Sequence, residues 1–167
     1  GRMKAAGFAA TPDQLLAMKI HGVTPEFAEE MKSAGYPNLS IDKLVASKIH
    51  GVNPKTITEI KQLGFSTLSI DQVMAARIHG VTPEHLRGLK EAGFADLSFD
   101  RAVAARIHGV TPQFAKAVRD TGFAVKDFEE LLRARIHGVT PEFIAKAQKM
   151  GFKELTFDKI VRLKQFN

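Results

Sequence analysis

The apolar positions of this chain form a pattern that repeats every 29 residues, the length of the copy at residues 21–49. In each copy, two short segments carry apolar side chains at helical spacing, and capping residues bound each segment. Thr24 and Pro25 begin the first segment, because a threonine hydroxyl caps a helix start and proline suits the first helical position. Gly35 ends it, since glycine adopts the left-handed backbone that closes many helices. We therefore predict a helix over residues 25–34.

A second helix follows in the same copy. Ser40 is a typical N-cap, and Asp42 lies in the first turn, where a negative charge stabilises the helix dipole. The apolar pattern stops near His50, so we predict a helix over residues 41–49. The same capping residues recur in the later copies. First helices are capped by Asn53, Thr82, Thr111 and Thr140 and closed by Gly64, Gly93, Gly122 and Gly151, and second helices are capped by Ser69, Ser98, Asp127 and Thr156.

These helices must stack to be stable. A helix of about ten residues is marginal alone in water, and one pair of such helices cannot bury its apolar side chains, whereas stacked copies can. We expect one buried valine per copy, at Val23, Val52, Val81, Val110 and Val139. We also expect a buried face on the second helices, at Leu44, Val45, Ile49, Val73, Met74, Ile78, Val103, Ile107, Leu131, Leu132 and Ile136. The predicted fold class is all-α, a solenoid or superhelix of two-helix repeats.

The repeats account for the whole chain, which we predict to be a single repeat domain over residues 1–167. Its predicted parts are a partial repeat at 1–20 and full-length repeats at 21–49, 50–78, 79–107, 108–136 and 137–167. In the partial repeat, residues 2–7 look like the end of a first helix, and Thr11 begins a second helix that reaches Ile20. Gln165 stands where the other repeats carry isoleucine, which we interpret as the polar ending of a terminal capping repeat. Because the chain begins within a repeat, we expect it to be part of a longer protein.

Composition and motifs exclude several classes of site. The chain has no cysteine, which excludes disulfides, thiolate metal sites and cysteine nucleophiles. No apolar run approaches the length of a membrane span, and the first residues lack the apolar segment of a signal peptide. The motifs of zinc peptidases, nucleotide-binding loops and serine hydrolases are absent. We therefore expect no enzymatic activity and no cofactor.

A histidine recurs once per repeat, in the phrase His-Gly-Val that follows each second helix. These residues, here called the histidine row, are His21, His50, His79, His108 and His137. Packed helices lie about 8–10 Å apart, whereas zinc ligands lie about 2 Å from the ion, so we expect no metal shared between repeats. The structural alternative is that each imidazole bonds the carbonyls that end the helix or packs against the next turn. His85 is outside the row and replaces the phenylalanine of other repeats, which we interpret as a tolerated substitution.

Basic residues also recur. A first basic row precedes the histidines and comprises Lys19, Lys48, Arg77, Arg106 and Arg135; a second lies on the first helices and comprises Lys32, Lys61, Lys90 and Arg119. With 24 basic and 18 acidic residues, the net charge is +6, which permits attraction to nucleic acid, acidic lipid or acidic protein. The structural alternative is that the cations stabilise helix C-termini. The candidate interaction surface combines the first basic row with the histidine row.

The whole repeat phrase, from Lys19 through the HGVTPEF segment to the next HGV at residues 50–52, resembles the tandem repeats in the C-terminal tails of bacterial BlaR/MecR-type membrane metallopeptidases. Proteins of that family are described as antirepressors that regulate drug resistance. Their zinc peptidase lies in a separate membrane domain with an HExxH motif, which this chain lacks, so no catalytic residue carries over. The resemblance implies a bacterial sensor or adaptor tail outside the cytoplasm, in the periplasm.

The turn between helices is also similar, more locally, to helix-hairpin-helix DNA-binding modules, in which a glycine turn offers its amides to phosphate. The matching glycines are Gly22, Gly51, Gly80, Gly109 and Gly138. The second glycine of that module is replaced here by threonine or asparagine. Two functional hypotheses follow: a non-catalytic scaffold that binds a protein or peptide, and, as the alternative, a sequence-tolerant nucleic-acid binder that uses the basic rows.

Overall fold

The computed structural model describes residues 9–166, and within that range the chain forms eleven α-helices and no strand. The helices are α2 (Pro12–His21), α3 (Pro25–Ser33), α4 (Ile41–Ile49), α5 (Pro54–Gln62), α6 (Ile70–His79), α7 (Pro83–Glu91), α8 (Phe99–His108), α9 (Pro112–Asp120), α10 (Phe128–Ile136), α11 (Pro141–Gln148) and α12 (Phe157–Gln165). The all-α class and the regular pairs of short helices are confirmed. The helix end predicted at residues 2–7 lies outside the described residues.

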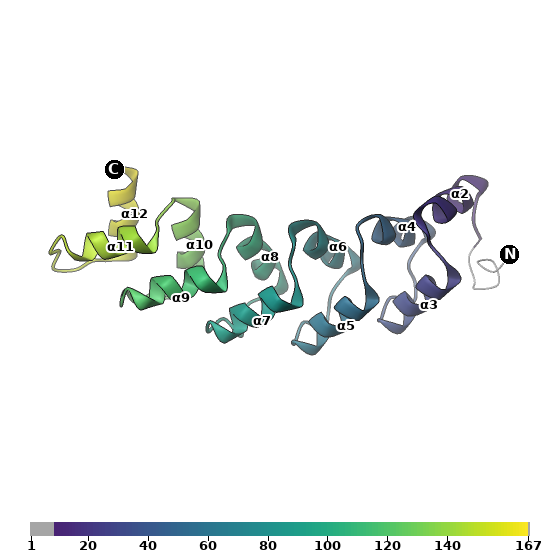
Figure 1. The fold of residues 1–167 in the computed structure, drawn as a ribbon, viewed down its shortest axis with the longest axis horizontal. Helices are drawn as coiled ribbons and strands as arrows, with labels where there is room; N and C mark the ends of the chain where they lie inside the picture. The colour runs from purple at the N-terminus through teal and green to yellow at the C-terminus, as the bar shows by residue number, and fades with distance from the viewer. Residues whose placement is uncertain (1–8, 167) are drawn as a thin grey trace. The chain divides into compact units, whose positions relative to one another are not determined.

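The chain divides into two compact units, residues 1–83 and 84–167. In the first unit, the second helices of the repeats, α2, α4 and α6, lie side by side, with α3 and α5 beside them in a separate row (Figure 1). In the second unit, α8 packs against α10, and α9 packs against α11, which also contacts α12 (Figure 1). Each unit therefore stacks equivalent helices of consecutive repeats against each other.

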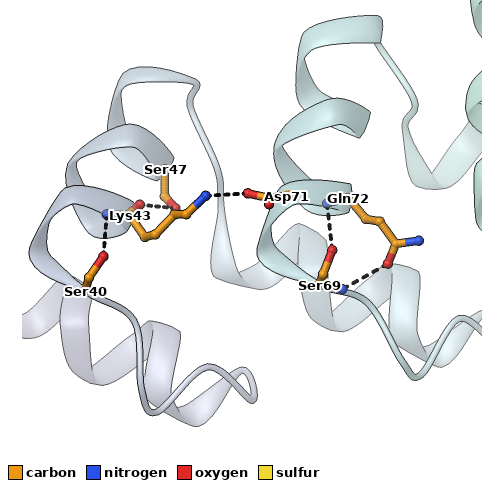
Figure 2. Close-up of polar contacts among 6 residues, drawn as sticks. All are labelled: Ser40, Lys43, Ser47, Ser69, Asp71 and Gln72. Carbon is orange, nitrogen blue, oxygen red and sulfur yellow. Dashed lines mark hydrogen bonds and ion pairs between the residues drawn. The ribbon is translucent and has the colours of Figure 1, made fainter.

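The helix starts follow the predicted caps. The Thr24 hydroxyl accepts a hydrogen bond from the Phe27 amide at 3.0 Å. Ser69 and Gln72 form a reciprocal capping box at the start of α6, in which each side chain bonds the other residue's backbone amide (Figure 2). The other confirmed N-caps are Thr11, Ser40, Asn53, Ser98, Thr111, Asp127, Thr140 and Thr156. The predicted closing glycines Gly35, Gly64, Gly93, Gly122 and Gly151 all have positive φ.

The core confirms one predicted row and corrects another. All five predicted valines are buried, with exposed fractions from 6% at Val23 to 0% at Val139. On the second helices, Leu44, Val73, Leu131 and Leu132 are buried as expected, and Val45, Met74 and Val103 are half-buried. The helix positions that lie deepest in several repeats are small residues, namely Ser47, Ala76, Ala105 and Ala134. Their size lets the second helices of neighbouring repeats approach each other closely.

The prediction that the isoleucines at the ends of these helices are buried is wrong. Ile49 is 54% exposed, and its counterparts in the other repeats are similar. At about 100° per residue, a position five residues after Leu44 lies about 140° around the helix from it, away from the buried face. Ser47, only three residues after Leu44, occupies the buried face instead.

The ending of the last repeat also differs from the prediction. Gln165 replaces a residue that is exposed in the earlier repeats, so its polarity does not seal a buried surface. Large apolar side chains nearby stay accessible, since Met150 is 59% and Phe166 is 90% exposed. Gln165 is therefore no evidence of a capping repeat.

Candidate interaction surface

The ten residues of the candidate interaction surface all lie exposed, at the C-terminal ends of the second helices. They are Lys19, His21, Lys48, His50, Arg77, His79, Arg106, His108, Arg135 and His137. The structure adds an exposed isoleucine between each basic residue and its histidine, and four of the five, all but Ile20, were predicted to be buried. This isoleucine row comprises Ile20, Ile49, Ile78, Ile107 and Ile136, with exposed fractions of 67%, 54%, 58%, 52% and 54%. Each of these repeats thus presents a basic residue, an isoleucine and a histidine in succession.

Of the two structural roles suggested for the histidine row, hydrogen bonding to helix-end carbonyls is absent among residues 9–166, which the structure describes, and packing against the next turn stays a prediction. His21, for example, is the last residue of α2, and His50 is the C-cap of α4. Within the described part of the chain, none of the five imidazoles makes a side-chain hydrogen bond or an ion pair, so the predicted bonds to helix-end carbonyls are absent. Over the same residues, no cluster of three or more potential metal ligands forms.

The first basic row contacts the beginning of its own repeat. The Lys48 ammonium lies 4.6 Å from the centre of the Phe27 ring. Arg135 Nε donates to the Gly109 carbonyl at 2.8 Å, and its guanidinium lies 4.7 Å from the Phe114 ring. These cations therefore contact the turn or the aromatic ring at the beginning of their own repeat, while remaining exposed.

The second basic row reaches back to the preceding repeat. Lys61 Nζ donates to the Ala34 carbonyl, the C-cap of α3, at 2.6 Å and lies 4.7 Å from the Tyr36 ring. Arg119 donates to the Ala92 carbonyl, just after α7. The expectation that cations stabilise helix C-termini is correct for these residues, but the helix stabilised belongs to the preceding repeat.

The acidic residues gather at the other end of the second helices. Asp71, in the first turn of α6, pairs with Lys43 of α4 at 2.7 Å (Figure 2). Equivalent contacts join Gln14 to Asp42, Arg101 to Glu129 and Arg133 to Asp158. The acidic partners lie in the first turns of their helices, toward the end away from the isoleucine row.

His85 lies in α7, at the position that holds Phe27 and Phe114 in other repeats, and is only 6% exposed. Its Nε2 lies 3.3 Å from the Ala102 carbonyl oxygen. Burial lowers the pKa of His85 most, the Ala102 contact raises it, and the positive charge of Arg106 lowers it further. His85 is thus a core residue rather than part of the exposed surface.

The second unit also contains an open hollow of about 380 Å³, lined by Phe94, Arg119, Phe123, Lys126 and Leu131, among others. At the equivalent place in the first unit, the Tyr36 hydroxyl donates to the Leu68 carbonyl at 3.0 Å. The Arg119 guanidinium in the hollow is already bonded to Ala92. The hollow is therefore a weaker candidate site than the surface that recurs in both units.

The glycine turns do not present their amides in the manner of a helix-hairpin-helix module. The Gly51 amide donates to the Lys48 carbonyl at 3.1 Å, and the Val52 amide donates to the Ser47 carbonyl at 2.9 Å. Both amides close the helix that precedes the turn, so they are not available to bind a phosphate.

Comparison with known protein families finds none that matches this chain, and comparison with curated protein sequences finds no significant match either. Among the described helices, none has the length and apolar character needed to cross a membrane.

Proposed function

We propose that this chain is a non-catalytic helical-repeat scaffold that binds a protein or peptide through the isoleucine row and the histidines and cations beside it. The observation that carries the proposal is the exposure of an isoleucine at the same position in five consecutive repeats, between 52% and 67%. A single exposed apolar residue needs no explanation, but exposed isoleucines on adjacent helices of one unit, as at Ile20, Ile49 and Ile78, are typical of an interaction surface.

Neither folding nor helix formation explains these isoleucines. Their side chains contribute little to the core, because more than half of each is exposed. Isoleucine is also a poorer helix former than leucine or lysine, since its branched side chain loses rotamer freedom in a helix. A partner that covers the row would account for the choice of residue.

Nucleic-acid binding, the alternative from the sequence, has less support. The amides of the Gly51 turn close the preceding helix, so they are not available to bind a phosphate. The residue between each cation and its histidine is an isoleucine, which has no favourable contact with a phosphate backbone. A role as the sensor or adaptor tail of an antirepressor-type regulator rests on the sequence resemblance alone and stays a prediction.

A peptide-display selection on the full chain tests the proposal. Random peptides are enriched on the unaltered protein and then scored on two variants, I49S/I78S in the isoleucine row and E59S/Q62S, a control pair of exposed residues on α5. Circular dichroism and thermal unfolding should be the same for all three proteins, because every substituted side chain is exposed. We expect the enriched peptides to bind the control variant as well as the unaltered chain and to lose binding to I49S/I78S. Peptides that bind all three proteins equally would refute this surface as the binding site.

A further inference from the structure

The charged residues that directly flank the isoleucines along the chain are all basic. In the first unit the row is flanked by Lys19, Lys48 and Arg77, all exposed, and the triplets that contain them include no acidic residue. Asp42 and Asp71 lie in the first turns of the same helices, seven residues before the isoleucine and so about 10 Å away along the helix. Both acidic groups are held by the preceding repeat, Asp42 by Gln14 and Asp71 by Lys43.

The contacts of the first basic row leave its cationic charge available. The Lys48 ammonium lies over the Phe27 ring, and this cation–π contact does not neutralise its charge. In the second unit, Arg135 donates its Nε–H to the Gly109 carbonyl, and its guanidinium has four further N–H donors. These contacts also fix the direction of each cation, so less side-chain freedom remains to be lost when a ligand binds.

The spacing of the row constrains the shape of a ligand. In the first unit α2 packs against α4 and α4 against α6, and packed helices lie about 8–10 Å apart. Successive isoleucines at Ile20, Ile49 and Ile78 are therefore separated by a similar distance, because they occupy equivalent positions on these helices. Three residues of an extended polyproline II segment span about 9 Å. A peptide in that conformation meets one isoleucine with every third side chain.

We infer that the isoleucine row takes an acidic, extended peptide segment with an apolar side chain at about every third residue and carboxylates between them. The apolar side chains contact the isoleucines, and the carboxylates pair with the first basic row and accept hydrogen bonds from the histidine row. This inference rests on the proposed function and specifies the chemistry of its partner.

A titration of the full chain into labelled synthetic peptides tests the inference. The first peptide has five Leu-Asp-Glu repeats, and its anisotropy reports binding. The second has the same composition with its leucines gathered at one end, and the third has five Leu-Lys-Arg repeats. We expect saturable binding of the first, binding of the second that is weaker by roughly tenfold, and none of the third. Added salt should weaken binding of the first peptide, since the charged groups are exposed.

Protein variants show which side chains are responsible. I49S/I78S and K19E/R77E should each weaken binding of the first peptide by roughly tenfold, and E59S/Q62S should leave it unchanged. Equal binding of the acidic and basic peptides, or no effect of I49S/I78S, would overturn the inference. So would binding through the isoleucine row to duplex DNA or to phosphatidylserine vesicles in place of the peptide. If none of the acidic peptides binds while display yields row-dependent peptides of another composition, the inference fails and the proposed function stands.

Discussion

Two rows of branched aliphatic residues run through these repeats three positions apart, and they have opposite environments. The valines that follow each glycine turn are buried, and Val110 has no exposed surface. The isoleucines that precede the turn are more than half exposed, and Ile107 is at 52%. The two side chains differ by one methylene group and share the same period, so hydrophobicity and periodicity alone do not determine which of them enters the core.

The turn between the rows explains the difference. Gly109 has φ 76°, and this left-handed residue reverses the chain at the end of α8. The Val110 amide then donates to the Ala105 carbonyl at 2.7 Å, which brings the valine back against the helix that it follows. Ile107 precedes the reversal and still follows the helical path, on the side away from buried Ala105. Backbone geometry, more than side-chain chemistry, therefore separates the core from the surface.

The largest expected effect is the difference between equal substitutions in the two rows. Val110→Ser should lower the free energy of unfolding by roughly 3 kcal/mol, because it removes buried methyl groups and buries a hydroxyl. Ile107→Ser should change it by less than about 0.5 kcal/mol, as is usual for an exposed site. Urea denaturation of the two variants measures both changes. Similar losses in the two would show that the isoleucine row belongs to the core.

The sequence was sufficient for the elements that depend on local chemistry. Thr24, Ser40 and Ser69 cap helices as predicted, because a hydroxyl at the start of a helix acts on amides only three residues away. The ends of the second helices were harder to assign. Spacings of four or five residues placed Ile49 on the buried face, whereas the buried face follows Leu44 and Ser47. The small residue at position 47 and its alanine equivalents are the sequence signal of close helix contact, and they would have identified the buried face.

The candidate surface was found only in part for a related reason. His50 and Lys48 are polar and were predicted to belong to an interaction surface. The apolar isoleucine between them was predicted to be buried. The contacts of Lys48 with Phe27 and of Arg135 with Gly109 join the end of a repeat to its beginning. Such contacts depend on how the helices pack in space, which the spacing of residues along the sequence does not give.

A smaller effect is expected from the glycine that separates the two rows. Gly109→Val should lower the free energy of unfolding by roughly 2 kcal/mol, since a branched residue is strained at φ 76°. Its Cβ would also come within 3.1 Å of Arg135 Nη2, which must then move. Gly109→Asn is the matched control, because asparagine tolerates the left-handed region better than valine. If the valine variant has the same melting temperature as the unaltered chain, the chain reversal does not need glycine.

The smallest expected effect concerns a third row, which holds Phe27, Phe114 and Phe143 and has His85 as its titratable member. Burial lowers the pKa of His85, so the unfolded chain binds more protons than the folded chain below the ordinary value of 6.5. The contribution of His85 to stability is therefore complete above that pH and is lost as the pH falls toward its lowered pKa in the folded chain. His85→Phe should remove this loss, and the melting temperature of the variant should fall less between pH 7.5 and pH 5.5, by a few degrees at most. The exposed histidines are common to both proteins, so the difference reports position 85. An equal fall in melting temperature for the two proteins across this pH range would mean that His85 binds a proton in the core without loss of stability.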